Sequence, residues 1–352
     1  MAVTFTVSPI IRGVTSCVPP RVVDNLEEAG EFQSEEVGKV VKLAGVRRRH
    51  LASERECSSD LCLAAARDVL QSLEWNPASI DALIMVTQTP DYFLPSTCCV
   101  IHRALGLSDK CAAFDVGLGC SGYPYGLCVA SMMLQSHGFR RALLLHGETP
   151  TRFSHSSDRA VALLFGDAGS ATALEAASSR TDRKWWFSLH TDGSGGDDLI
   201  LPGGGFRDRF PQDARKHYVF MNGANVFSFT IKRVLPLIED TLRAAGLTKE
   251  EIDYYIFHQS NQFIIRHLLR KAGVPEAKVP LTIGEFGSAG GPSVPLTITR
   301  GNLLRPPDRS LTLLLLGYGV GLSWGSALVD LPPAAVVNHV ILPENCTVTG
   351  RG

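Results

Sequence analysis

Two spacings of apolar residues alternate along the chain. In several stretches apolar positions recur three and four residues apart, as on one face of a helix, and short continuous apolar runs typical of buried strands separate these stretches. Strands that alternate with helices predict a parallel or mixed sheet with helices on its faces, which is an α/β fold. We expect helices over residues 62–73, 122–135, 226–245 and 262–272.

The longest apolar stretch runs from Leu311 to Val329 and contains no charged residue. Glycines interrupt it, and Arg309 and Asp330 bound it at only about the minimum length of a membrane span, roughly 20 residues. We therefore predict two buried strands joined at residues 317–319, and no membrane span.

The chain also resembles itself over two pairs of segments. Residues 76–89 resemble 248–260, because each contains Ile-Asp before a buried run with a polar end. Residues 160–174 resemble 313–328 in the same way, through apolar residues followed by a glycine-rich turn. These similarities indicate a duplicated architecture.

The duplication predicts an N-terminal half over residues 1–175 and a C-terminal half over residues 185–335, joined by a glycine-rich loop. A tail over residues 336–352 has no clear periodicity, and we expect it to be loosely held. Because each half supplies a sheet, the halves should stack as five layers in the order α/β/α/β/α.

Composition narrows the class of protein. The chain has 352 residues, 45% of them hydrophobic, and a formal net charge of −1, which suits a large core and gives no basic surface for nucleic acid or an anionic membrane. Its 9 cysteines have no CxxC pair and no spacing that suits zinc, so we expect free thiols, a reducing compartment and no metal site. The first residues lack the features of a signal peptide, and we expect a cytoplasmic protein.

Cys120 is the best candidate nucleophile. It lies in a glycine-rich turn, within residues 112–126, between a predicted strand and the first turn of a predicted helix. Unpaired amide N–H groups and the positive end of the helix dipole favour a thiolate there. The alternative is that Cys120 is simply a small buried cysteine.

Two further polar loops follow apolar runs. His258 comes directly after the strand-like residues 254–257, and a second glycine-rich turn covers residues 287–293. Polar loops at the ends of strands are the usual way in which an α/β protein builds one active site, so we expect these loops to meet Cys120. The alternative for His258 is a hydrogen-bonded histidine of the core.

Two other classes of protein compete with this interpretation. Residues 117–122 satisfy the G-x-G-x-x-G pattern of a dinucleotide-binding oxidoreductase, but that pattern alone is weak, Glu148 is only approximately placed as the ribose-binding acid, and a cysteine has no purpose in such a turn. A non-catalytic partner subunit that keeps the fold would be expected to lose Cys120 or His258, and both are present.

The ordered motifs resemble a known family. Residues 45–50, 115–122, 164–169, 221–227, 258–261 and 317–325 are similar to those of the thiolase-fold condensing enzymes, most closely the β-ketoacyl-ACP synthase III group. The resemblance implies a thiolase-like fold and an acyltransferase of fatty acid or polyketide biosynthesis. The cysteine accepts an acyl group from a thioester of CoA or acyl carrier protein (ACP), and the enzyme joins it to a carbanion from malonyl-ACP. No cofactor is implied beyond these substrates.

The chemistry of the residues agrees with that reaction. The tetrahedral oxyanion needs fixed N–H donors, for which we expect the amide of Cys120 and one from the 317–321 turn, Gly319 or Val320. His258 is expected to hold the carbonyl oxygen of the second thioester while carbon dioxide leaves.

The chain departs from the family at the third catalytic position. The family has an asparagine there, and aligning the following Ser-Val-Pro places Ser288 at this position. A hydroxyl is shorter than the amide and has one donor where the amide has two. Decarboxylation is then weakened or dispensed with, or Ser288 works with a water. An acyltransferase that forms an ester or amide without decarboxylation stays open, as does Asn261 as a substitute donor.

The resemblance also implies partners. The family is homodimeric and sends a loop residue into the partner's acyl pocket, which corresponds to Leu94 here. Arg270 and Lys271 match a basic pair that contacts the carrier protein, although such a pair is most often a solvated helix face. The family's tryptophan and arginine around the CoA adenine have no equivalents in residues 37–44.

Overall fold

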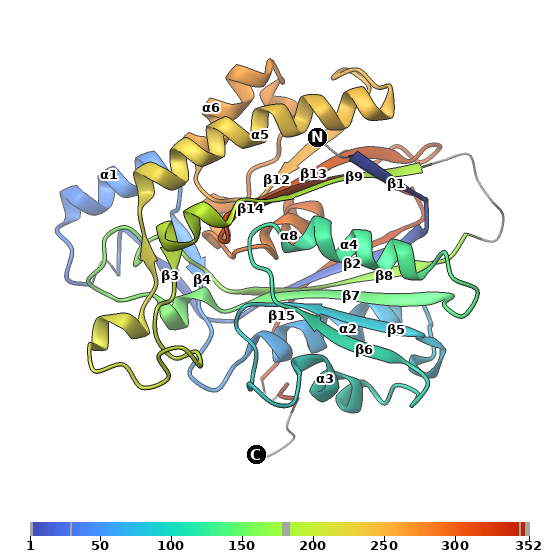
Figure 1. The fold of residues 1–352 in the computed structure, drawn as a ribbon, viewed down its shortest axis with the longest axis horizontal. Helices are drawn as coiled ribbons and strands as arrows, with labels where there is room; N and C mark the ends of the chain where they lie inside the picture. The colour runs from blue at the N-terminus through green and yellow to red at the C-terminus, as the bar shows by residue number, and fades with distance from the viewer. Residues whose placement is uncertain (1–2, 29, 178–183, 345, 349–352) are drawn as a thin grey trace.

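The computed structural model describes residues 3–28, 30–177, 184–344 and 346–348, and it arranges them in five layers (Figure 1). Helices α5 and α6 form one outer layer and α2 and α3 the other, with α4 and α8 between the two sheets. This is the expected thiolase-like α/β/α/β/α arrangement. The α-helices are α1 Ser34–Ala44, α2 Ser58–Ser72, α3 Thr97–Leu105, α4 Gly122–Met133, α5 Gly223–Ala245, α6 Gln262–Ala272, α7 Ile283–Phe286 and α8 Ser293–Arg300.

The two large sheets are mixed. One has the order β15-β2-β8-β7-β5-β6 and the other the order β1-β9-β14-β13-β12. The first consists of β15 Val336–Ile341, β2 Ile10–Val18, β8 Ala168–Glu175, β7 Arg141–Glu148, β5 Ala82–Val86 and β6 Ala112–Val116, and the second of β1 Val3–Val7, β9 Lys184–Thr191, β14 Ser323–Leu331, β13 Leu311–Gly319 and β12 Tyr254–Phe257. Two small ladders pair β3 Val22–Asp24 with β4 Arg48–His50, and β10 Leu199–Ile200 with β11 Phe220–Met221.

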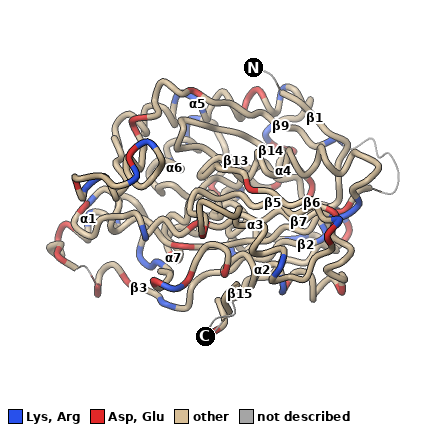
Figure 2. Tube along the Cα trace, turned by 60° about the horizontal axis from the view of Figure 1, so that its bottom comes forward, with Lys and Arg blue, Asp and Glu red and all other residues tan. Residues whose placement is uncertain are grey.

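Helix α4 joins the two sheets by packing apolar side chains against both of them. It is apolar around most of its circumference, as expected for a helix buried between two sheets. Its Tyr123 and Leu127 are fully buried in one cluster with Leu144 of β7 and Leu313 of β13. Charged residues of both signs lie mainly on loops and outer elements (Figure 2). Within the described ranges, no helix has the length and apolar character that crossing a membrane requires.

The four predicted helices are confirmed to within a few residues, but the predicted position of one turn is wrong. Residues 317–319 end β13 instead of joining two strands, and the chain turns at residues 320–322. The reason is that β13 approaches the backbone of the Cys120 turn closely at Gly317. A Cβ on Gly317 would lie 2.7 Å from the carbonyl oxygen of Cys120, so this glycine lets a strand pack directly on the backbone of the Cys120 turn.

The expectation of a loosely held tail is also wrong for its first part. Residues Val336–Ile341 form β15, which pairs in parallel with β2, and the Val348 amide donates to the Asp60 carboxylate at 2.7 Å. Every residue of β15 is at least partly exposed, so the strand has none of the alternation that identifies a half-buried strand in a sequence. At the other end of the chain, β1 joins the sheet of the C-terminal half.

Candidate active site

Cys120 lies in the turn between β6 and α4, two residues before the helix begins. The turn is closed by the Gly122 amide, which donates to the Gly119 carbonyl at 2.8 Å. The end of β13 lies on the other side of the sulfur. If Gly319 carried a Cβ, that atom would lie only 2.9 Å from Cys120 Sγ, so only a glycine fits here without displacement. The nucleophile therefore has backbone on both sides, from its own turn and from the end of β13.

The resting form of Cys120 differs from the predicted thiolate. Burial raises the pKa of the thiol to about 11, while the backbone amides of Val320 and of Cys120 itself oppose that rise. The effect of desolvation on the pKa exceeds that of the N–H groups, although Cys120 keeps part of its surface exposed. The two amides that stabilise negative charge at the sulfur are both among the expected oxyanion donors.

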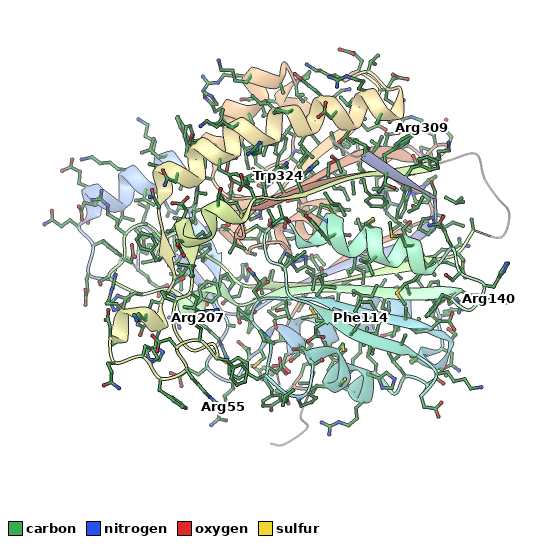
Figure 3. The ribbon with its side chains drawn as sticks, viewed as in Figure 1. Arg55, Phe114, Arg140, Arg207, Arg309 and Trp324 are labelled. Carbon is green, nitrogen blue, oxygen red and sulfur yellow. The ribbon has the colours of Figure 1, made fainter. Side chains whose placement is uncertain are left out.

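Hydrogen bonds hold the turn that carries Val320. Asp192 and Leu322 exchange two backbone hydrogen bonds, at 2.8 and 3.1 Å, and the Ser323 hydroxyl donates to the Val320 carbonyl at 2.8 Å. Beside this turn Trp324 lies beneath α5 (Figure 3), with the guanidinium of Arg233 over its ring at 5.1 Å. The backbone of the turn is thereby held in one orientation.

His258 follows β12 and is buried, with 3% of its surface exposed. Burial lowers its pKa to about 4, so the imidazole is neutral at physiological pH. The hydroxyl of Tyr318, on β13 between the two glycines that face Cys120, donates to the His258 carbonyl at 3.3 Å. One strand thus contacts both candidate catalytic residues.

Ser293, the first residue of α8, contacts the imidazole of His258. Its Oγ accepts from the Gln259 amide at 3.0 Å and lies 2.9 Å from His258 Nδ1. A hydroxyl that accepts from this amide still has its own proton to donate to Nδ1, and we infer this arrangement, in which His258 carries its proton on Nε2. Ser293 was not predicted as a site residue, because its only signal in the sequence is its place within the glycine-rich residues 287–293.

Ser288 lies in the turn between α7 and α8 and is buried, with 2% of its surface exposed. Its amide donates to the Leu164 carbonyl at 2.9 Å, and its carbonyl accepts from the Gly166 amide at 3.2 Å. Its hydroxyl makes no hydrogen bond to any residue that the structure describes. The backbone is therefore held while the hydroxyl stays available.

The three predicted loops meet. A Cβ on Gly291, from the turn that carries Ser288, would lie 2.5 Å from the Gly119 carbonyl oxygen of the Cys120 turn. It would also collide with the ring of His146, a fully buried residue of β7 that the sequence analysis did not single out. Burial and nearby His258 lower the pKa of His146 to about 3, so it is neutral as well.

Glu148, at the end of β7, is buried beneath the same loop. Its carboxylate accepts from the Gln88 amide at 2.8 Å and from the Thr89 hydroxyl at 3.0 Å, and burial raises its pKa to about 8. Its Cγ would lie 3.3 Å from a Cβ on Gly290. A carboxylate enclosed in this way is not placed to bind a ribose, as the dinucleotide-binding alternative requires.

The remaining predicted residues lie apart from Cys120. The Oδ1 of Asn261 caps α6 by accepting from the amides of Phe263 and Ile264 at 2.8 and 3.4 Å, which is a structural role. Leu94 is 86% exposed in the loop between β5 and α3. Arg270 and Lys271 lie in the last turn of α6, where the negative end of the helix dipole also favours cations.

Comparisons with known proteins place two parts of the chain in one family. Residues 114–193 match the family model for 3-oxoacyl-[acyl-carrier-protein (ACP)] synthase III, and residues 242–331 match the model for its C-terminal part. A putative 3-oxoacyl-[acyl-carrier-protein] synthase 3 of Campylobacter jejuni is 33% identical over 94% of this chain and 96% of its own length.

Solved structures are similar over nearly the whole chain. The 3-oxoacyl-(acyl-carrier protein) synthase of Burkholderia xenovorans LB400 is 39% identical with a TM-score of 0.92, over 97% of this chain and 99% of that chain. The priming β-ketosynthase of the R1128 polyketide pathway is 26% identical with a TM-score of 0.82, over 93% and 97% of the two chains. These similarities overturn the dinucleotide-binding and non-catalytic interpretations. The chain belongs to the 3-oxoacyl-ACP synthase III family of thiolase-fold condensing enzymes, which are acyltransferases that form carbon–carbon bonds.

Proposed function

We propose that this enzyme loads an acyl group from an acyl thioester of CoA or ACP onto Cys120 and condenses it with malonyl-ACP. The observation that carries the proposal is the position of the Cys120 sulfur between two backbone segments, with the amides of Cys120 and Val320 favouring negative charge there. Neutral His258 and the free hydroxyl of Ser288 belong to the same group of loops.

In the first half-reaction the sulfur of Cys120 attacks the thioester carbonyl. The amides of Cys120 and Val320 hold the oxyanion, the carbon–sulfur bond to the donor breaks, and the donor leaves as a free thiol that takes the cysteine proton. Because the thiol pKa is about 11, this step depends on donors that act on charge as it develops.

In the second half-reaction malonyl-ACP loses carbon dioxide. The Nε2–H of His258 and the hydroxyl of Ser288 donate to the thioester oxygen of the enolate that forms, and the enolate carbon then attacks the acyl group on Cys120. The carbon–sulfur bond to Cys120 breaks, β-ketoacyl-ACP leaves, and the thiolate regains a proton from solvent. Ser288 supplies one hydrogen bond to this enolate.

Loading is tested by intact-protein mass spectrometry after incubation with a panel of acyl thioesters. We expect the mass of one acyl group to be added to the wild type and to the Cys99→Ala control, in which an exposed cysteine is removed, and neither acylation nor turnover in Cys120→Ala. A label that persists in Cys120→Ala refutes the nucleophile. Formation of an ester or amide from the acyl-enzyme without release of carbon dioxide would support the non-decarboxylative alternative.

We also propose that the carrier protein docks on α6. A groove between α1 and α6 contains three cationic side chains, one acidic one and the exposed ring of Phe263, which suits an acidic partner: its lining includes Lys42, Phe263, Arg266, Arg270 and Glu276. The double variant Arg270→Glu, Lys271→Glu should raise KM for malonyl-ACP and leave acylation by a small thioester unchanged. An unchanged KM refutes this docking site.

Finally, we propose a homodimer in which Leu94 enters the partner's acyl pocket. Leu94 is 86% exposed and follows Tyr92 and Phe93, which are 50% and 59% exposed, so this loop presents unusual apolar area to solvent. Light scattering should report a dimer, and Leu94→Phe should change the acyl chain-length preference. A monomer, or an unchanged preference, refutes it.

A further inference from the structure

The C-terminal strand β15 lies at the edge of its sheet, between α8 on one face and α2 on the other (Figure 1). The family model for the C-terminal part ends at residue 331, before this strand. The two faces of β15 contact different layers of the molecule.

His339 is the residue of β15 that contacts the central layer. Its Nδ1 lies 2.8 Å from the hydroxyl of Ser16 on β2, and that hydroxyl lies 2.5 Å from the hydroxyl of Thr299 on α8. Burial, together with Arg300 and His50, lowers the pKa of His339 to about 4, so the hydrogen bond is made by a neutral imidazole.

The ring of His339 also packs edge-on against the ring of Phe286, with centroids 5.6 Å apart. Phe286 also stacks on His50 at 5.3 Å and lies under the guanidinium of Arg300 at 5.8 Å. It belongs to a buried apolar cluster with Val18, Ala168, Ala289 and Leu296. Phe286 is itself 4% exposed, so its ring is enclosed by these groups. His339, from the last strand of the chain, is one of the groups that enclose Phe286.

Phe286 and Thr299, which His339 contacts directly or through Ser16, lie on elements that carry or hold the residues assigned to the second half-reaction. Phe286 is the last residue of α7 and stands two residues before Ser288. Thr299 belongs to α8, the helix whose first residue, Ser293, holds Nδ1 of His258.

We propose that His339 is a positioning residue for the condensation step, holding Phe286 and Thr299 so that Ser288 and His258 converge on the second thioester. This inference rests on the proposed function. It assigns to the C-terminal strand the support of one half of the active site.

Asn338 provides a matched control on the same strand. Successive side chains of a strand point to opposite faces, and the amide nitrogen of Asn338 donates to Asp68 at 2.9 Å and to Ser72 at 3.1 Å, on the α2 side. Asn338→Ala weakens the attachment of β15 as His339→Ala does, but on the face away from Ser288.

The kinetic experiment measures the two half-reactions separately in the full chain. His339→Ala should leave the rate of Cys120 acylation within twofold, while product formation from pre-acylated enzyme and malonyl-ACP slows by roughly tenfold to a hundredfold, the order of loss expected when a catalytic group shifts by about 1 Å. Asn338→Ala should leave both rates within twofold. Equal losses in the two variants, or a loss of acylation as deep as that of condensation, overturns the inference.

Two conservative variants separate the contacts of His339 and still serve if His339→Ala does not fold. His339→Asn retains a hydrogen-bonding group near Ser16 without the ring, and His339→Phe retains the ring on Phe286 without the hydrogen bond. Each should restore part of the condensation rate lost in His339→Ala. If both condense at the wild-type rate, the inference is wrong.

Hydrogen exchange of the free enzyme tests the same idea without substrate. Amide exchange over residues 286–300 should rise several-fold in His339→Ala and stay unchanged in Asn338→Ala. If amide exchange over residues 286–300 is unchanged in His339→Ala, the positioning role is wrong, even when the wild type catalyses condensation as proposed. Conversely, a wild type that no thioester acylates refutes the proposed function, while the exchange result still decides whether His339 supports this loop.

Discussion

The two sides of the active site use different kinds of hydrogen-bond donor: backbone amides around Cys120 and side chains around His258. Around Cys120 the groups that stabilise charge are backbone amides, and the close packing comes from Gly317 and Gly319. Around His258 the groups are side chains, and they depend on Ser293 from another element. Backbone donors are kept under most substitutions, whereas a side-chain donor is lost by one mutation. The sequence-based expectation that the chain departs from the family pattern at Ser288, on the side-chain side, is consistent with this difference.

The largest expected effect is on the backbone side. Gly319→Ala places a Cβ 2.9 Å from Cys120 Sγ and 2.8 Å from its Cβ, which displaces both the nucleophile and the adjacent Val320 amide. Cys120 acylation should slow by about a thousandfold, because one oxyanion donor and the attack geometry change together. Gly193→Ala, where a Cβ has open space, is the control and should acylate normally. Normal acylation of Gly319→Ala would show that the backbone side tolerates crowding.

Ser288 gives the next largest effect and separates the two sides. Ser288→Ala should leave acylation within a few-fold but slow product formation by roughly a hundredfold, because a hydrogen bond to the enolate is lost. Ser288→Asn introduces the asparagine that the family resemblance predicts at this position. If carbon dioxide release from malonyl-ACP rises in this variant, the natural enzyme is weakened in decarboxylation and favours another acceptor. If Ser288→Ala loses acylation as deeply as turnover, the assignment of Ser288 to the second side is wrong.

Ser293 should have a smaller effect on the same step. In Ser293→Ala the Nδ1 of His258 loses its partner, both neutral tautomers become populated, and condensation should slow by roughly tenfold while acylation is retained. Ser293→Thr keeps the hydroxyl and should recover part of the rate. Nitrogen-15 NMR of the histidine side chains checks the cause, since the wild type should show His258 protonated on Nε2 alone. A wild type with mixed tautomers would contradict the role of Ser293.

The backbone side was also the more predictable from sequence, because its strand, turn, cysteine and helix are contiguous. The fold class, four helices and the meeting of three loops followed from local patterns. Ser293 did not, since only the tertiary structure brings it to His258. Gly317 and Gly319 were misplaced because a glycine signals either a turn or a close approach, and its distant partner Cys120 decides between them. The thiolate was overestimated because helix-dipole reasoning omits desolvation.

Glu148 connects the two sides and should have the smallest effect, on stability. It lies beneath Gly290 of the Ser288 loop, yet its charge contributes to raising the pKa of Cys120. Its own pKa is raised by burial from an ordinary 4.5 to about 8, so between these pH values the folded enzyme holds a proton that the unfolded chain has released. The free energy of unfolding therefore falls as pH rises across this window, by at most about 1.4 kcal/mol per pH unit.

Glu148→Gln removes this titration and keeps the shape of the side chain. The wild-type Tm should therefore decline relative to that of Glu148→Gln from pH 5 to pH 8, by roughly 2 °C per pH unit, and run parallel to it above about pH 8, where both states of the wild type are ionised. The contribution of Asp167, whose pKa burial raises to about 6, is common to both proteins and cancels in the difference. Parallel melting curves from pH 5 upward would mean that Glu148 is ionised throughout, and that a fixed negative charge already lies beside the Cys120 turn when the thioester arrives.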